Sequence, residues 1–414
     1  GLKKKKKIKT KLEKFKKKFS KFIKSKYTLA VTSGTAALRI ALATLNLKKN
    51  DEVIAPAFTF VATVEAIIES GAQPIIAEID KTLNISYEEF KSKITKKTKA
   101  LIVVHMLGVP TDLYKIRNLC KKRNIKLIED TAWGCGATYR KKKLGTYGDI
   151  GAFSFDFAKT ITTGEGGMLC FKSKKLYQKA AAWHDHGHEN NPKVPRWEDT
   201  RSSSGFNFRM NEMQGAVGIA QLKKINFILK KKRKNYFLIK NQIKNIEGVE
   251  IRHCPNNSHI SADSLIFFMP NKMHAIKCRK ELLKFGISTK ILPEATTWHF
   301  AKDWSHIWIT GNYFVHSLST TLMALFIGVI VDKYKAVRIF HFGLIPIILG
   351  LLLLCFSSNS YFVVPYMILI GLGSGFGYTA QPALIAEIYG VKYIGSIKSF
   401  ITAITVFGSA IGPI

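Results

Sequence analysis

The charged residues divide this chain into two parts near residue 309. Residues 309–414 carry only seven charged side chains, whereas Lys and Arg recur throughout the part before them. Four apolar stretches in this tail are each long enough to cross a bilayer: 309–331, 338–356, 361–381 and 393–414. Buried core helices are the alternative, but four such segments in succession would leave no polar face for water. The sequence therefore predicts about four transmembrane α-helices at 309–414.

The part before the tail alternates short apolar runs with stretches of helical spacing. The expected strands are 53–56, 74–79, 100–105, 125–130 and 150–155. The expected helices between them include 35–45, 60–70 and 111–122. Because such alternation requires crossover connections, it predicts a mainly parallel sheet covered on both faces, hence an α/β domain at 28–235. A shorter α+β pattern at 236–306 predicts a partial small domain.

The formal net charge of +36 first suggests a nucleic-acid partner, since clustered Lys and Arg displace counterions from phosphates. The excess is spread over the whole chain, however, and no nucleic-acid-binding signature accompanies it, so we expect no nucleic acid. The first 26 residues are the densest run, with 14 Lys. Apolar residues spaced three and four apart predict that 1–27 is a basic amphipathic helix docked on the body. They are Ile8, Leu12, Phe15, Phe19 and Phe22.

The six cysteines are widely spaced and include no CxxC pair, so the sequence predicts neither a zinc site nor a disulfide framework. The segment WHDHGH at 183–188 also suggests a metal site. No further ligands are evident elsewhere to complete its coordination, and we therefore expect no metal.

Three stretches carry candidate chemistry. TSGTAAL at 32–38 opens a helix, where free backbone N–H groups favour a phosphate, although an ordinary helix cap is the commoner role. Asp130 ends an apolar strand and either pairs with a protonated pyridine nitrogen or caps the next turn; the residues alone leave both open. Lys159 follows an aromatic strand and precedes a Gly-rich turn. This context favours an amine desolvated enough to lose its proton and form a Schiff base.

These stretches occur in motifs that resemble a known family. SGTAAL, EDTAWG, FSFDFAK and TGEGG appear in the order found in the DegT/DnrJ/EryC1/StrS family of pyridoxal-phosphate (PLP) sugar aminotransferases, and the resemblance covers about 10–306. It implies the type I fold of PLP-dependent transferases, with a large domain at 28–235 and a truncated small domain at 236–306. It also implies a cytoplasmic enzyme that uses PLP, glutamate and a keto-sugar.

The resemblance also implies roles for single residues. Lys159 would carry PLP as a Schiff base and move a proton between the substrate carbon and the cofactor. Asp130 would hold the pyridinium nitrogen, and Phe60 would stack on the ring. The cofactor phosphate would be held by Gly34, Thr35, Ser154 and, from the neighbouring subunit of a homodimer with shared active sites, Asn207.

The same resemblance points to a substrate side of the site. Trp133 stands where many relatives have Gln or His, which predicts a more apolar cover over the cofactor ring. His184, His186 and Arg209 are the expected substrate residues. The sequences of 153–167, 184–196 and 199–218 are most similar to 8-amino-3,8-dideoxy-manno-octulosonate aminotransferases of lipopolysaccharide biosynthesis. A sugar-nucleotide 3- or 4-aminotransferase is the alternative.

The tail resembles part of a major facilitator superfamily transporter, through the segment 328–335 and Arg338. A complete transporter has about three times as many spans. We therefore consider an aminotransferase whose C-terminus was replaced by gene fusion or assembly error, with its tail in the inner membrane. The alternative is a transporter fragment with an inactive enzyme-derived domain, and the joint presence of Lys159 and Asp130 favours the first hypothesis.

Overall fold

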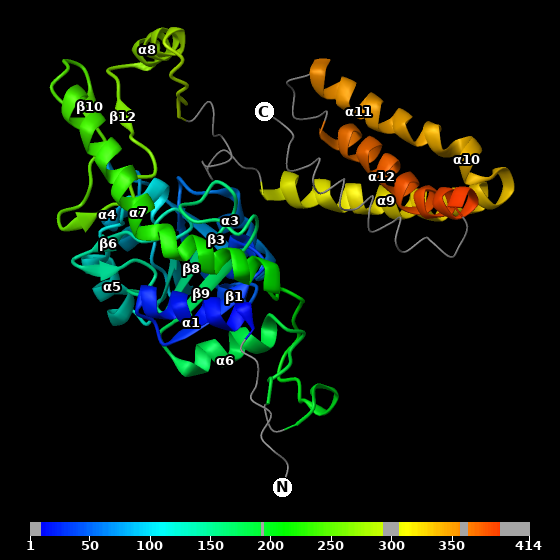
Figure 1. Cartoon of the computed structure of the whole chain (residues 1–414), viewed down its shortest axis with the longest axis horizontal. Helices are drawn as coiled ribbons and strands as arrows, with labels where there is room; N and C mark the ends of the chain where they lie inside the picture. The colour runs from blue at the N-terminus through cyan, green and yellow to red at the C-terminus, as the bar shows by residue number, and fades with distance from the viewer. Residues whose placement is uncertain (1–9, 192–193, 293–305, 357–362, 390–414) are drawn as a thin grey trace. The chain divides into compact units, whose positions relative to one another are not determined.

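The computed structural model describes residues 10–191, 194–292, 306–356 and 363–389 (Figure 1). The chain divides into two compact units, Gly1–Asp303 and Trp304–Ile414. The boundary lies five residues before the start of the tail expected from its composition.

A seven-stranded sheet with the order β1-β9-β8-β5-β4-β2-β3 forms the centre of the first unit. The five strands from β3 to β8 are parallel to their neighbours, whereas β9 is antiparallel to both β8 and β1. This confirms the mainly parallel α/β sheet expected from the sequence. The strands are β1 Tyr27–Val31, β2 Glu52–Pro56, β3 Gln73–Ala77, β4 Thr98–Val104, β5 Lys126–Asp130, β8 Ile150–Ser154 and β9 Gly167–Phe171.

Helices cover both faces because successive strand residues point to opposite sides. On β2, Val53 and Ala55 belong to one buried cluster with residues of α2, α3 and α6, whereas Ile54 belongs to another with residues of α4 and α5. Parallel strands need such crossover helices between them. Their bounds are α2 Gly34–Ala43, α3 Val61–Glu69, α4 Tyr87–Ser92, α5 Leu113–Lys122 and α6 Lys174–Trp183, with the short helix η1 at Met106–Gly108.

The N-terminal helix α1 (Lys11–Ile23) packs with α7 (Glu212–Ile243) in Figure 1. Phe15 and Phe19 are fully buried, and the Phe19 ring lies 5.1 Å from that of Phe153 on β8. Gly218 of α7 makes room for this contact, since a Cβ there would lie 2.7 Å from the Phe15 ring. The expected apolar residue Ile8 lies outside the described residues.

The segment after residue 243 contains two small sheets and a helix. These are β10 Glu250–Ile251 with β12 Phe267–Phe268, β11 Ser258–His259 with β6 Thr138–Tyr139 and β7 Lys142–Lys143, and α8 Lys272–Lys284. Arg252 ties the segment to the large domain, because its buried guanidinium donates to the carbonyls of Thr82 and Met106. The expected domain boundary at 235/236 falls inside α7, and the last part of the expected small domain, 293–305, lies outside the described residues.

The second unit consists of helices. They are α9 His306–Tyr334, α10 Ala336–Ile339, η5 Phe340–Gly343, α11 Leu344–Phe356 and α12 Val363–Tyr389. Ile327 and Val331 of α9 and Phe376 and Ala380 of α12 are buried in one cluster. The carboxylate of Glu387 accepts from the backbone N–H groups of residues 336 and 337, at 2.7 and 3.0 Å.

The expected transmembrane helices are not found in the part of the tail that the structure describes. No helix there combines the length and the apolar composition needed to cross a membrane. The expected span 338–356 is divided between α10, η5 and α11. At ~1.5 Å per residue, the 13 residues of α11 would measure about 20 Å, less than the ~30 Å of a bilayer core. The expected span 393–414 lies outside the described residues.

Candidate active site

Lys159 lies in the 155–166 connection between the antiparallel strands β8 and β9. Hydrogen bonds within the loop hold it: the Lys159 N–H donates to the Asp156 carbonyl at 3.1 Å, and the Thr163 N–H donates to the Phe155 carbonyl at 2.8 Å. The Phe155 N–H in turn donates to the Gly166 carbonyl at 2.8 Å. The loop therefore gives the lysine backbone a defined position at the end of a buried strand.

The Lys159 amine is half-buried against an aromatic ring. Its Nζ lies 3.4 Å from the centre of the Trp133 ring. Burial lowers the pKa of Lys159, and the carboxylates of Asp156 and Asp130 offset this in part. A lowered pKa increases the fraction of neutral amine, which is the form that attacks a carbonyl.

Asp130 is the last residue of β5, and its charge and that of Lys159 affect each other's pKa. Its carboxylate accepts from the Ala132 N–H at 3.0 Å and from the Thr63 hydroxyl at 3.2 Å. Burial raises the pKa of Asp130, while the Ala132 N–H, the Lys159 charge and the Thr63 hydroxyl lower it. The nearby donors and the Lys159 charge thus stabilise the ionised Asp130 carboxylate, whereas burial destabilises it.

The start of α2 lies against the end of β8. A Cβ at Gly34 would come within 2.7 Å of the Ser154 Cβ and 3.0 Å of its Oγ, so only glycine allows this approach. The Ser33 hydroxyl caps α2 by accepting from the Ala36 N–H at 3.0 Å. The structure thus brings Gly34 and Ser154 together at the N-terminus of a ten-residue helix, with Thr35 exposed beside them.

These residues fit a phosphorylated pyridine aldehyde such as PLP. A helix N-terminus with a glycine that admits close backbone approach suits a phosphate. A buried carboxylate held by two donors suits a pyridinium, and a lysine with a lowered pKa suits an aldehyde. The phosphate-binding helix end, the carboxylate and the lysine come from different elements, at the edge of the sheet where the parallel strands have their carboxyl ends. Phe60 caps α3 (Val61–Glu69) and is 41% exposed.

The other expected substrate and phosphate residues lie in the loop between α6 and α7. Asp185 binds Arg196 through two hydrogen bonds of 2.8 and 2.6 Å and also pairs with Arg209. The Thr32 N–H donates to the carbonyl of residue 208 at 3.0 Å, so Arg209 runs beside the end of β1. Asn207 is exposed, and its backbone forms an isolated antiparallel β-bridge with that of Asp185.

The two histidines of this loop differ in their surroundings. His184 is half-buried, and its Nδ1 lies 2.6 Å from the Ala181 carbonyl, so that nitrogen carries the proton. Burial lowers the pKa of His184. His186 is exposed, with a left-handed φ of 56°. Neither histidine is placed against Lys159 by any contact within this chain that the structure describes.

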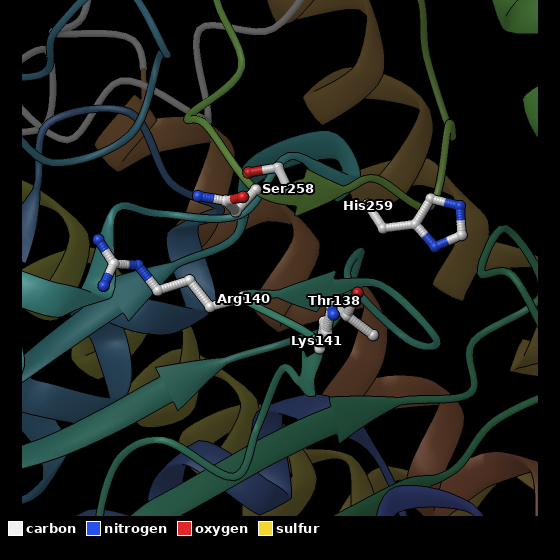
Figure 2. A pocket seen from close by; sticks show the side chains of 6 residues that line it. Thr138, Arg140, Lys141, Ser258 and His259 are labelled. Atoms are coloured by element: carbon white, nitrogen blue, oxygen red, sulfur yellow. The ribbon is translucent and has the colours of Figure 1, made fainter.

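A cavity of about 950 Å³ adjoins Trp133. Its lining is mainly apolar and includes Phe58, Leu83, Leu107 and Leu292. A second hollow of about 710 Å³ lies between the β6–β7 turn, which carries Arg140 and Lys141, and β11 with Ser258 and His259 (Figure 2). No expected site residue lines this second hollow.

Sequence reasoning missed the polar groups behind Asp130. Thr63 bonds Asp130 directly, and the neighbouring Glu129 points to the opposite face of β5, where it accepts from the N–H groups of residues 145, 147 and 148. His105 Nδ1 accepts from the Thr111 N–H, so Nε2 carries the proton that faces Glu129 at 3.1 Å. Because neighbouring strand residues point to opposite faces, the sequence could have predicted that Glu129 faces away from Asp130. No local pattern indicates that Thr63 contacts Asp130.

Comparisons with known proteins agree with this arrangement. Residues 4–307 match the sequence model of the DegT/DnrJ/EryC1/StrS aminotransferase family, and residues 285–414 match that of the Major Facilitator Superfamily. A GDP-perosamine synthase of Vibrio cholerae is 40% identical over 223 residues, which are 54% of this chain and 59% of that protein. The chain therefore spans less than two thirds of the length of this curated relative.

Two solved structures share the fold of the first unit. An aminotransferase from Psychrobacter cryohalolentis has a TM-score of 0.64 and 31% identity, over 67% of this chain and 75% of that one. The Escherichia coli GDP-4-keto-6-deoxy-D-mannose-3-dehydratase with bound hydrated PLP also has a TM-score of 0.64, with 29% identity over 70% of this chain and 79% of that one. Both likenesses support the type I fold for the part of the chain before the tail.

Proposed function

Because this chain belongs to the DegT/DnrJ/EryC1/StrS aminotransferase family, we propose that it is a PLP-dependent enzyme that moves an amino group from glutamate to a keto-sugar. The observation that carries this proposal is the half-buried Lys159 amine beneath Trp133, with the buried carboxylate of Asp130 close enough to affect its pKa. Lys143 is also half-buried with a pKa lowered by burial, but no carboxylate affects its pKa, so the buried Asp130 is what distinguishes Lys159.

Each part of the site would have a distinct task. When bound, PLP supplies an electron sink for the substrate carbon that gains or loses a proton. The N-terminus of α2, Gly34 and Ser154 would bind the phosphate, and Asp130 would keep the proton on the pyridine nitrogen. Lys159 would bind the cofactor aldehyde and would move the proton at the substrate carbon. Trp133 excludes water from that amine.

Two observations favour different sugars. The sequences of 153–167, 184–196 and 199–218 support an 8-keto-octulosonate of lipopolysaccharide biosynthesis. The names of relatives, GDP-perosamine synthase and GDP-4-keto-6-deoxy-D-mannose 3-dehydratase, support a nucleotide-linked keto-sugar instead. Glutamate-dependent turnover of both compounds by the same preparation separates them, and faster conversion of the nucleotide sugar excludes the octulosonate as the main substrate.

The enzyme proposal is tested by Lys159→Ala in the full chain. With added PLP, the unchanged protein should show the visible absorption band of lysine-bound PLP, and the variant should lack it because no other amine occupies that place. Lys143→Ala is a matched control, since Lys143 is also half-buried, has a pKa lowered by burial, and lies 4.4 Å from the Phe22 ring centre. A band that survives in the Lys159 variant contradicts the proposal.

For the tail we propose a membrane location, supported by the match of 285–414 to the Major Facilitator Superfamily. Exposed apolar side chains in the second unit also favour it, among them Leu325, Phe326 and Val329 of α9. Fractionation of cells that express the full chain should place it with membranes at neutral pH and high salt. Recovery in the soluble fraction overturns this proposal, and one long sequencing read across codons 300–315 shows whether the two parts are joined in the genome.

A further inference from the structure

Two buried threonine hydroxyls form a row of hydrogen bonds that ends at Asp130. The hydroxyl oxygens of Thr59 and Thr63 lie 2.7 Å apart, and that of Thr63 lies 3.2 Å from Asp130 Oδ2. Both threonines are fully buried, and Asp130 is 6% exposed. The contact joins α3 to β5 across 67 residues of sequence.

The chemistry of the three side chains decides which group donates in each of these hydrogen bonds. An ionised carboxylate only accepts hydrogen bonds, so Thr63 must donate to Asp130. The single Thr63 proton is then in use, and Thr63 must accept from Thr59. Hydrogen bonds in such a row strengthen one another, and a bond to a charged acceptor is the stronger kind.

The helix holds Thr63 in a fixed position for its hydrogen bond to Asp130. Thr63 lies in the first turn of α3, where its N–H donates to the carbonyl of Phe60 at 3.0 Å. Its neighbours on the helix, Ala62, Val64 and Ala66, are buried and apolar. A buried hydroxyl in such surroundings is unfavourable unless it is hydrogen-bonded, and that of Thr63 bonds with Thr59 and Asp130.

We propose that Thr63, supported by Thr59, is a positioning residue for the proposed cofactor: its hydroxyl orients the Asp130 carboxylate toward the pyridine nitrogen and keeps it ionised. This inference rests on the proposed function. Burial raises the pKa of Asp130, and a neutral carboxyl group would not hold a pyridinium. The Ala132 N–H and the Lys159 charge also favour its anion, whereas His105 is hydrogen-bonded to Glu129 on the opposite face of β5.

The test is Thr63→Val, which replaces the hydroxyl with a methyl group of similar size. Loss of the donor raises the pKa of Asp130 further, so more of the carboxyl is neutral as the pH falls. We expect PLP affinity, followed through the absorption of lysine-bound PLP, to weaken on the order of tenfold at about pH 6. The loss should be smaller at about pH 8, because a higher pH favours the ionised carboxylate in both proteins.

Three further variants make the result specific. Thr63→Ser keeps the donor and should restore the binding and its pH profile, and Thr59→Val should give a smaller shift in the same direction. Thr44→Val is the matched control, since Thr44 is also buried but its hydroxyl donates to the Ala41 carbonyl in α2. Equal binding by Thr63→Val and Thr44→Val at both pH values overturns the inference, as does a loss that is the same at both. Absence of the band in the unchanged protein contradicts the proposed function instead.

Discussion

Burial and aromatic contact act in opposite directions on the Lys159 ammonium group. The Trp133 ring, 3.4 Å from Nζ, attracts a cation, and the charges of Asp156 and Asp130 also favour it. The pKa of Lys159 is nevertheless lowered, so the loss of hydration has the larger effect. The tryptophan therefore contributes mainly as a cover that keeps water from the amine.

Gly34 offers a test of the phosphate end at the scale of one residue. Gly34→Ala places a Cβ 2.7 Å from the Ser154 Cβ, so α2 or β8 must move. We expect the free energy of unfolding in urea to fall by about 1–3 kcal/mol, as in other overpacked sites, and PLP affinity to fall with it.

The double variant Gly34→Ala/Ser154→Gly removes the two side-chain atoms that would clash. Gly34→Ala should therefore lower the free energy of unfolding much less in the Ser154→Gly protein than in the unchanged chain. PLP binding should stay weak, because the serine hydroxyl is missing. A double variant as unstable as Gly34→Ala would mean that the close approach is not the reason for the glycine.

At the scale of elements, the periodic pattern predicted β2, β3, β4, β5 and β8 because buried parallel strands are continuous apolar runs. It did not predict β9, whose partners β1 and β8 are antiparallel to it. It also placed a domain boundary at 235/236, where α7 continues unbroken. Which segments pair, and whether a helix continues across a boundary, depends on contacts far away in sequence.

The α6–α7 loop depends on Asp185, and its stability should depend on pH. Hydrogen bonds and charges from Arg196 and Arg209 hold the pKa of Asp185 well below its usual range. A depressed folded-state pKa stabilises the protein above the unfolded pKa of about 3.9 and ceases to do so as the pH falls through the folded value. Because both guanidinium groups are about half exposed, we expect Asp185→Asn to lower the free energy of unfolding by only about 1–2 kcal/mol at neutral pH.

The difference between Asp185→Asn and the unchanged chain should shrink below about pH 4, where urea unfolding can follow it. Glu198→Gln removes a negative charge from the exposed short helix η2 (Arg196–Glu198) of the same loop and serves as the control. A loss of stability that does not vary with pH would show that Asp185 acts by packing rather than by charge.

At the scale of the whole molecule, the proposed dimer predicts that subunits complement each other. Asn207 pairs with Asp185 of its own chain only through a backbone β-bridge, and it is exposed, as a residue that reaches a neighbouring subunit would be. A mixed dimer of one Lys159→Ala subunit and one Asn207→Ala subunit contains one site with both residues intact. Its glutamate-dependent activity should be about half that of the unchanged dimer.

Each homodimeric variant provides the comparison. Lys159→Ala should be inactive and Asn207→Ala strongly weakened, and co-expression with two affinity tags isolates the mixed species. If Asn207 acts within its own subunit, the mixed dimer has no intact site. Its activity would then be no higher than the mean of the two homodimers.

The sequence by itself determined the class of the fold and the candidate cofactor residues, because strand periodicity and the motifs around Asp130 and Lys159 are local patterns. Only the tertiary structure decided which groups meet. Trp133 covers Lys159, Gly34 excludes a side chain against Ser154, and Thr63 donates to Asp130. These partners are tens of residues apart, and their contact depends on strand order and on which face each side chain takes, which no local pattern specifies.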